Sequence, residues 1–221
     1  MSNSPFQVIG ADGANGTNAT KGTDGGDGRN AVQGTSSGGK NPTCQNPQDP
    51  TPGSPGNRAG QASAGSDGNI TGSGIFHLGD VDGKVMITYS GGAGGNGGNG
   101  ANGGKGGDGG NGAAASGPCK QINGANGGKG GDATDGKPGG NGANGPNVVI
   151  YYTSKTPSTT FSIDTSRLKG GTGGTGGSGG AGGKGGSFGG SNGQNGSTGN
   201  AAAPGKSGAP GSIVVRQEPP S

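Results

Sequence analysis

Apolar residues cluster in short segments that are separated by long polar stretches rich in glycine. These segments occupy residues 6–9, 75–89, 148–163 and 212–215. They are rich in β-branched and aromatic side chains, and Val85, Ile87 and Tyr89 alternate with the residues between them, which is typical of strands. Asp82-Gly83 indicates a hairpin turn. The pattern predicts a small antiparallel β-sheet or sandwich.

Between these segments, glycine recurs at every third residue. The tracts that keep this period are 10–34, 53–68, 91–112, 124–145, 170–187 and 190–211. Where a tract loses a glycine from the period, alanine replaces it, as at Ala19, Ala133 and Ala202. A flexible linker has no reason to keep this phase, whereas a close backbone contact on one face of a helix requires it. Residues 35–57, which include several prolines, are predicted to form an irregular loop.

A three-residue period matches the polyproline II helix, which has 3 residues per turn and rises about 3.1 Å per residue. This helix makes no internal hydrogen bonds, so its N–H and C=O groups need partners on neighbouring chains. The sequence therefore predicts one domain, 1–221, that is mostly irregular or polyproline II and has essentially no α-helix. In it, a bundle of polyglycine II helices is attached to the sheet. Gly-Gly-X tracts are expected inside the bundle, and Gly-X-X tracts outside.

Composition excludes an ordinary globular domain. The chain has 64 glycines among 221 residues, 22% hydrophobic residues and no tryptophan, so a side-chain core of normal size cannot form. A collagen-like triple helix and disorder stay open at this stage, although the prolines lie largely outside the best repeats. The net charge of +3 is small and dispersed, and long apolar runs are lacking. We therefore expect neither nucleic-acid binding nor membrane insertion.

Residues suited to catalysis are scarce. His77 is the only histidine, and no nucleophile, base and acid can be grouped from the sequence. We expect no enzyme activity, no cofactor and no metal site. Cys44 and Cys119 could form one bridge or none. The first residues do not have the pattern of a secretory signal, so the export route of a surface protein stays open.

Two known kinds of protein share the glycine pattern. Gly94–Gly100, Lys21–Gly25 and Gly182–Ser187 resemble the glycine-rich antifreeze proteins of springtails, which are bundles of polyproline II helices with a flat Thr/Ala/Ser face for ice. The same strings are similar in principle to glycine-rich phage tail-tip adhesins, which stack polyglycine II helices and recognise a bacterial surface protein through end loops. These resemblances imply the fold more than a function.

The sequence therefore leads to two functional hypotheses. The first is a non-enzymatic structural or surface-recognition protein, such as a rigid spike, fibre subunit or adhesin tip. It would be open to self-assembly and would bind itself or a cell-surface receptor. The alternative is ice binding through Thr172, Thr175, Ser178 and Ala181, which recur about 9 Å apart on one tract. Either role predicts an extracellular, cell-surface or virion location.

Overall fold

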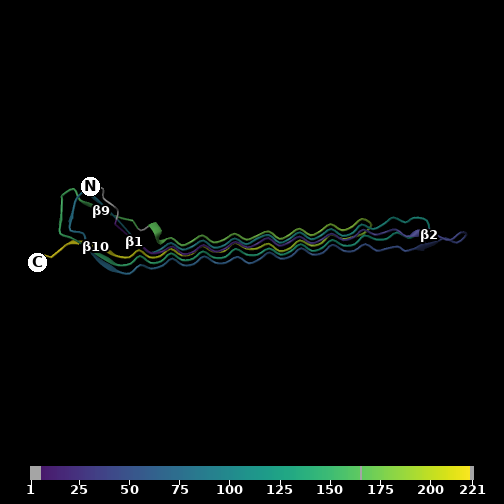
Figure 1. Cartoon of the computed structure of the whole chain (residues 1–221), viewed down its shortest axis with the longest axis horizontal. Coiled ribbons are helices and arrows are strands. Elements are labelled where there is room, and N and C mark those ends of the chain that lie inside the picture. The colour runs from purple at the N-terminus through teal and green to yellow at the C-terminus, as the bar shows by residue number, and fades with distance from the viewer. Residues whose placement is uncertain (1–5, 165, 220–221) are drawn as a thin grey trace.

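The computed structural model describes residues 6–164 and 166–219 and shows a long, thin rod (Figure 1). Both ends of the chain lie at the end of the rod that carries the main β-strands, and β2 (Thr35–Ser37) lies at the opposite end. We number the glycine tracts I (10–34), II (53–68), III (91–112), IV (124–145), V (170–187) and VI (190–211). In the described part of the chain, no helix is long and apolar enough to cross a membrane.

The tracts form two layers of polyproline II helices. Tracts I, III and V run parallel to one another in one layer, and tracts II, IV and VI do so in the other. Within a layer, every third N–H donates to the next tract, as from Gly13 to the Ala93 carbonyl at 2.8 Å. Between layers the tracts are antiparallel, as shown by the 2.8 Å bond from the Gly131 N–H to the Gly104 carbonyl. Backbone hydrogen bonds thus replace the missing side-chain core.

Close contact explains how many glycines each triplet needs. In tract III, a Cβ on Gly95 would lie 2.0 Å from the Ala14 carbonyl oxygen, and one on Gly94 would lie 2.0 Å from that of Gly140. Tract I has no earlier neighbour in its layer, so its equivalent positions carry exposed side chains such as Thr17. The expectation that Gly-Gly-X tracts lie inside holds for III and IV. It is wrong for V, which ends its layer but still packs closely against III and VI.

The structure corrects the predicted antiparallel sheet. Two three-stranded sheets form the cap, with orders β1-β6-β9 and β10-β7-β4, and every neighbouring pair in them is parallel. Their strands are β1 (Phe6–Ile9), β4 (Gly74–His77), β6 (Lys84–Ser90), β7 (Val148–Tyr152), β9 (Thr160–Asp164) and β10 (Ile213–Gln217).

The parallel pairing follows from the bundle, because each strand continues a helix of one layer. Phe6 pairs with Ile87 in the sheet, and Asn15 bonds to Asn96 in the bundle, so the same separation of 81 residues holds in both. The register of the helices is therefore the register of the strands. The chain makes elongated turns, each running out along one layer and back along the other.

The two sheets face each other over a small apolar core of Ile87, Tyr89, Val148 and Ile150, all nearly inaccessible to solvent. The short strands β5 (Asp80–Val81) and β8 (Ser154–Lys155) pair in parallel and connect the sheets across the end of the rod. Asp82-Gly83 is therefore a corner between β5 and β6, which pair with other strands, and the predicted hairpin is wrong there. A 3-10 turn, η1 (Ser166–Leu168), precedes tract V.

The far end of the rod, which we call the tip, consists of residues 32–50 and 113–123. Here β2 and β3 (Thr43–Gln45) form an antiparallel hairpin. Residues 35–57 are thus not an irregular loop throughout, because they contain this hairpin and the start of tract II. A disulfide joins Cys44 of the hairpin to Cys119 in the connection between tracts III and IV.

Candidate functional site

The residues of the predicted ice-binding row lie on the outer face of the layer formed by tracts I, III and V. Thr172, Thr175, Ser178 and Ala181 are all exposed along tract V. They do not stand alone, because the X positions of tracts I and III lie beside them in register. The face is therefore an array three helices wide, with rows that repeat about every 9 Å along the axis.

Asparagine and aspartate side chains connect neighbouring helices across this face. The Asn99 Oδ1 accepts the backbone N–H of Thr175 at 2.8 Å and its hydroxyl at 3.2 Å. The backbone N–H of Asn99 in turn donates to the Oδ1 of Asn18 at 2.8 Å. The row above repeats the arrangement with Asn15, Asn96 and Thr172. Each such bond satisfies an outward N–H that the polyproline II helix cannot pair internally.

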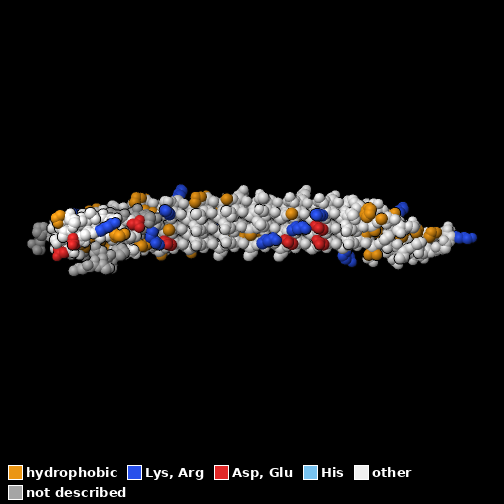
Figure 2. All heavy atoms as spheres, turned by 90° about the horizontal axis from the view of Figure 1, so that it is seen from above, with side chains coloured by type: hydrophobic (Ala, Val, Ile, Leu, Met, Phe, Trp, Pro, Cys, Tyr) orange, Lys and Arg blue, Asp and Glu red, His pale blue; other side chains and the backbone are white. Residues whose placement is uncertain are grey.

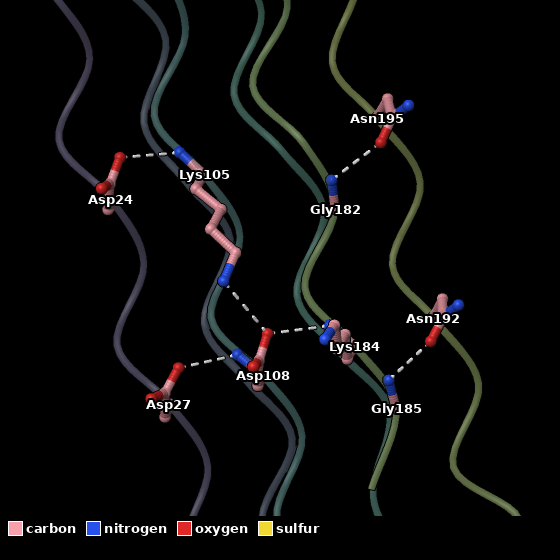
Figure 3. A network of polar contacts seen from close by, with 9 residues as sticks. All are labelled: Asp24, Asp27, Lys105, Asp108, Gly182, Lys184, Gly185, Asn192 and Asn195. Atoms are coloured by element: carbon pink, nitrogen blue, oxygen red, sulfur yellow. Dashed lines mark hydrogen bonds and ion pairs between the residues drawn. The ribbon is translucent and has the colours of Figure 1, made fainter.

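Two rows in the half of this face nearer the tip are charged (Figure 3). Asp24 and Asp27 accept the backbone N–H groups of Lys105 and Asp108, and Asp108 accepts that of Lys184. The backbone bond from Lys105, followed by the side-chain bond from Lys21, lowers the pKa of Asp24. The bond from Lys184 lowers the pKa of Asp108 in the same way. Neutral rows lie on both sides of these charges: two rows of Asn and Thr nearer the β-cap, which contain Thr172 and Thr175, and one row of Asn30, Asn111 and Ser187 next to the tip.

This ladder of Asx side chains was not predicted from the sequence. Its signal is present, since Asn or Asp fills one fixed X position of tract I at most of its triplets. Those positions could be interpreted only once the neighbouring tract and its register were known.

The tip is held by side chains as well as by the disulfide. The Gln33 amide Nε2 donates to the carbonyls of Ala114 and Lys120, which joins the two segments of the tip. A shallow groove of about 390 Å³ lies beside it, lined by Asp49, Pro50 and residues 121–125. Residues contributed by distant parts of the chain are thus fixed together at the point farthest from both chain ends.

The single histidine belongs to the cap. His77 stacks on Tyr151 with ring centroids 5.2 Å apart, and its Nδ1 lies 2.5 Å from the Glu218 Oε1. This hydrogen bond lowers the pKa of Glu218. Among the residues that the structure describes, no group of three or more His, Cys, Asp or Glu side chains could hold a metal ion.

Comparison with models of known protein families gives no match, and comparison with curated proteins gives none either. Among solved structures, the chain is similar to a springtail antifreeze protein from Granisotoma rainieri, a bundle of nine polyproline type II helices. The two are 28% identical, and the match covers 74% of this chain and 96% of that one, with a TM-score of 0.17. A likeness this weak carries no argument about function. The resemblance to phage adhesins stays a prediction.

Proposed function

We propose that this protein is a non-enzymatic rigid rod that displays a stapled tip for surface recognition. The observation that carries the proposal is the separation of the two ends of the rod. Both chain ends leave from the β-capped end, and the tip that contains Cys44 and Cys119 lies at the other. Tract III alone has 22 residues (91–112), which at about 3.1 Å each spans roughly 70 Å.

The bundle of tracts I to VI, which we call the shaft, suits the display of the tip at a distance from the cap. Backbone hydrogen bonds recur at every triplet along it, and most glycines leave no room for a Cβ, so the helices cannot slide or bend freely. Figure 2 shows that the shaft has few apolar side chains on the face drawn, whereas they are more frequent toward both ends. The disulfide favours an oxidising location outside the cell, on a cell surface or on a virion.

A binding assay on intact cells tests this role. The protein, labelled at its amino terminus, is applied to panels of bacterial and animal cells. It is compared with a variant in which residues 35–43 are replaced by a Gly/Ser loop of equal length. We expect saturable binding that the tip variant loses while its rod-shaped scattering profile is kept. Equal binding by both proteins, or binding by neither, would contradict tip recognition.

Ice binding is the second candidate, and one specific observation favours it. The neutral rows hold Thr172 and Thr175 in a fixed register with Asn96 and Asn99, which gives a flat and regularly spaced surface. If this surface binds ice, Thr175→Lys should abolish thermal hysteresis. Ser197→Lys, on the outer face of the other layer, should leave it unchanged. Absence of thermal hysteresis in the unaltered protein would exclude this candidate.

A further inference from the structure

The outer face of the sheet β10-β7-β4 carries an apolar row that no described residue covers. Val148 and Ile150 point into the core, whereas the alternate positions point outward. The outward row nearest the bundle consists of Ile75, Val149 and Val214, which are paired in register, and Ile75 and Val214 are 64% and 45% exposed. A groove of about 430 Å³ lies along this row. Parallel sheets are normally covered on both faces, and within the described part of the chain nothing covers this one.

Exposed apolar and charged residues also lie on the part of this face that the bundle forms. The next outward row of the sheet is His77, Tyr151 and Arg216, with Arg216 lying over the Tyr151 ring. Toward the shaft, the same face shows Ile70, two residues after the end of tract II, and Ala209 on tract VI. Asp67 on tract II and Lys206 on tract VI follow. All four of these residues are exposed.

We propose that this face binds the same face of a second copy, with the two rods parallel and related by a two-fold axis along their length. That axis places β4 and tract II of one copy against β10 and tract VI of the other. Ile75 then lies opposite Val214, and Ile70 opposite Ala209. Apolar residues therefore meet apolar residues on both sides of the axis.

The charges are complementary under the same operation. Asp67 of one copy lies opposite Lys206 of the other. Glu218, whose carboxylate is bound to His77 beside β4, lies opposite Arg216. Nearer the tip the match ends, because Asp132 and Asp135 on the central tract IV would face their own copies. The contact thus covers the cap and the adjoining half of the shaft.

Addition of a further helix to the layer of tracts I, III and V is hindered at both of its edges. In tract III, a Cβ on Gly95 or Gly98 would lie 2.0 Å from a carbonyl oxygen of tract I. The equivalent column of tract I carries Ala14, Thr17 and Thr20 instead, so another helix cannot approach it as closely. At the opposite edge of this layer, Asn192 and Asn195 of tract VI reach over tract V and accept the N–H groups of Gly185 and Gly182. The sheet face is therefore the better site for a second copy.

This dimer goes beyond the proposed display role, and the two can fail separately. Pairing at the cap places two tips at the same end, so a monomeric variant should keep tip recognition and lose only avidity.

Sedimentation across a range of concentrations tests the dimer. We expect a monomer–dimer equilibrium for the full chain. Val214→Asp should weaken it at least tenfold, and Val32→Asp, which alters an exposed apolar residue at the tip, should not change it. Asp67→Lys and Lys206→Asp should each weaken it, and the double variant should recover because opposite charges face each other again. A monomer at every concentration, or a dimer indifferent to Val214→Asp, would overturn the proposal.

Discussion

The Thr134 hydroxyl donates to the Gly60 carbonyl at 2.8 Å and accepts the Ala101 N–H at 3.2 Å. At the other triplets along tracts II and III, an N–H of tract III donates directly to a carbonyl of tract II. At this level the helices are spread by the buried side chains of Ala59, Ala62, Ala133 and Thr134. One hydroxyl therefore bridges the gap that the methyl groups open.

Replacing Thr134 with valine should destabilise the rod, because it keeps the shape and removes both bonds. Two partly buried backbone groups, the Gly60 carbonyl and the Ala101 N–H, would be left without partners, at a cost of about 1–3 kcal/mol. The free energy of unfolding, measured by circular dichroism in denaturant, checks this. Thr198→Val, at an exposed position, is the matched control and should be neutral. Equal stability of the two variants would show that the bridge contributes nothing.

Glycine positions should differ sharply in their tolerance of alanine. A Cβ on Gly183 would lie 1.8 Å from the Gly107 carbonyl oxygen, whereas one on Gly26 would meet nothing within 4 Å. We expect Gly183→Ala to lower the free energy of unfolding by about 3 kcal/mol or more, since overpacking forces the backbones apart. Gly26→Ala should change it by less than about 1 kcal/mol. A tolerated Gly183→Ala would contradict the close packing of tracts III and V.

A gap in the Asx ladder offers a gain of stability. Lys21 occupies the position from which Asn15 and Asn18 accept N–H groups of tract III, and a lysine side chain cannot accept one. Lys21→Asn should supply the acceptor for the Asn102 N–H and add about 1 kcal/mol to stability. Lys21→Gln separates this effect from the loss of charge, because its longer side chain does not fit the same geometry. Equal melting temperatures for Lys21→Asn and Lys21→Gln would contradict this prediction.

Acid should loosen the ladder. Backbone hydrogen bonds from Ala93, Lys105, Lys184 and Ser197 lower the pKa values of Asp12, Asp24, Asp108 and Asp132, respectively. A carboxylate whose pKa is lower in the folded state stabilises the fold above its unfolded pKa, near 3.9. That stabilisation is lost as the pH falls through the lower folded value. Unfolding free energy should therefore be flat from pH 7 to 5 and decline below pH 4. A rise in stability below pH 4 would contradict this assignment.

Reduction should act on the tip. The Cys44–Cys119 disulfide links residues 75 apart, and removing such a cross-link costs about 4 kcal/mol in the chain-entropy description. We expect a lower melting temperature with a reductant, and faster amide exchange in residues 35–45 and 113–122. Tract V, far from the disulfide in sequence, should keep its protection at moderate temperature. Faster exchange in tract V alone would show that the staple acts elsewhere.

The sequence predicted the period, the tracts and most strand positions, because these depend on local spacing. Phe6–Ile9 was identified with the same bounds that β1 has in the structure. The direction of the sheets was predicted wrongly, since strands such as β6 and β9 pair only because tracts III and V lie in one layer. A three-residue period shows which face of a helix carries only glycine, but it does not show which other tract packs against that face. The order of the tracts within each layer could not be predicted from the sequence. The Asx ladder depends on that order, so it could not be predicted either.

Residue-resolved amide exchange tests the central claim, that backbone hydrogen bonds between neighbouring helices hold the rod together. In tract I, Gly13 and Gly16 donate to tract III, and the N–H of Asn15 has no acceptor within the described chain. In tract III, the N–H groups of Gly95, Asn96 and Gly97 are all bonded. In tract I we predict slow exchange at every third residue, and also at Thr17 and Arg29, whose N–H groups donate to hydroxyls of tract II or its start. In tract III we predict slow exchange at nearly all residues, with Asn102 as an exception because Lys21 offers its N–H no acceptor. Uniformly fast exchange, or protection without this difference, would contradict the account.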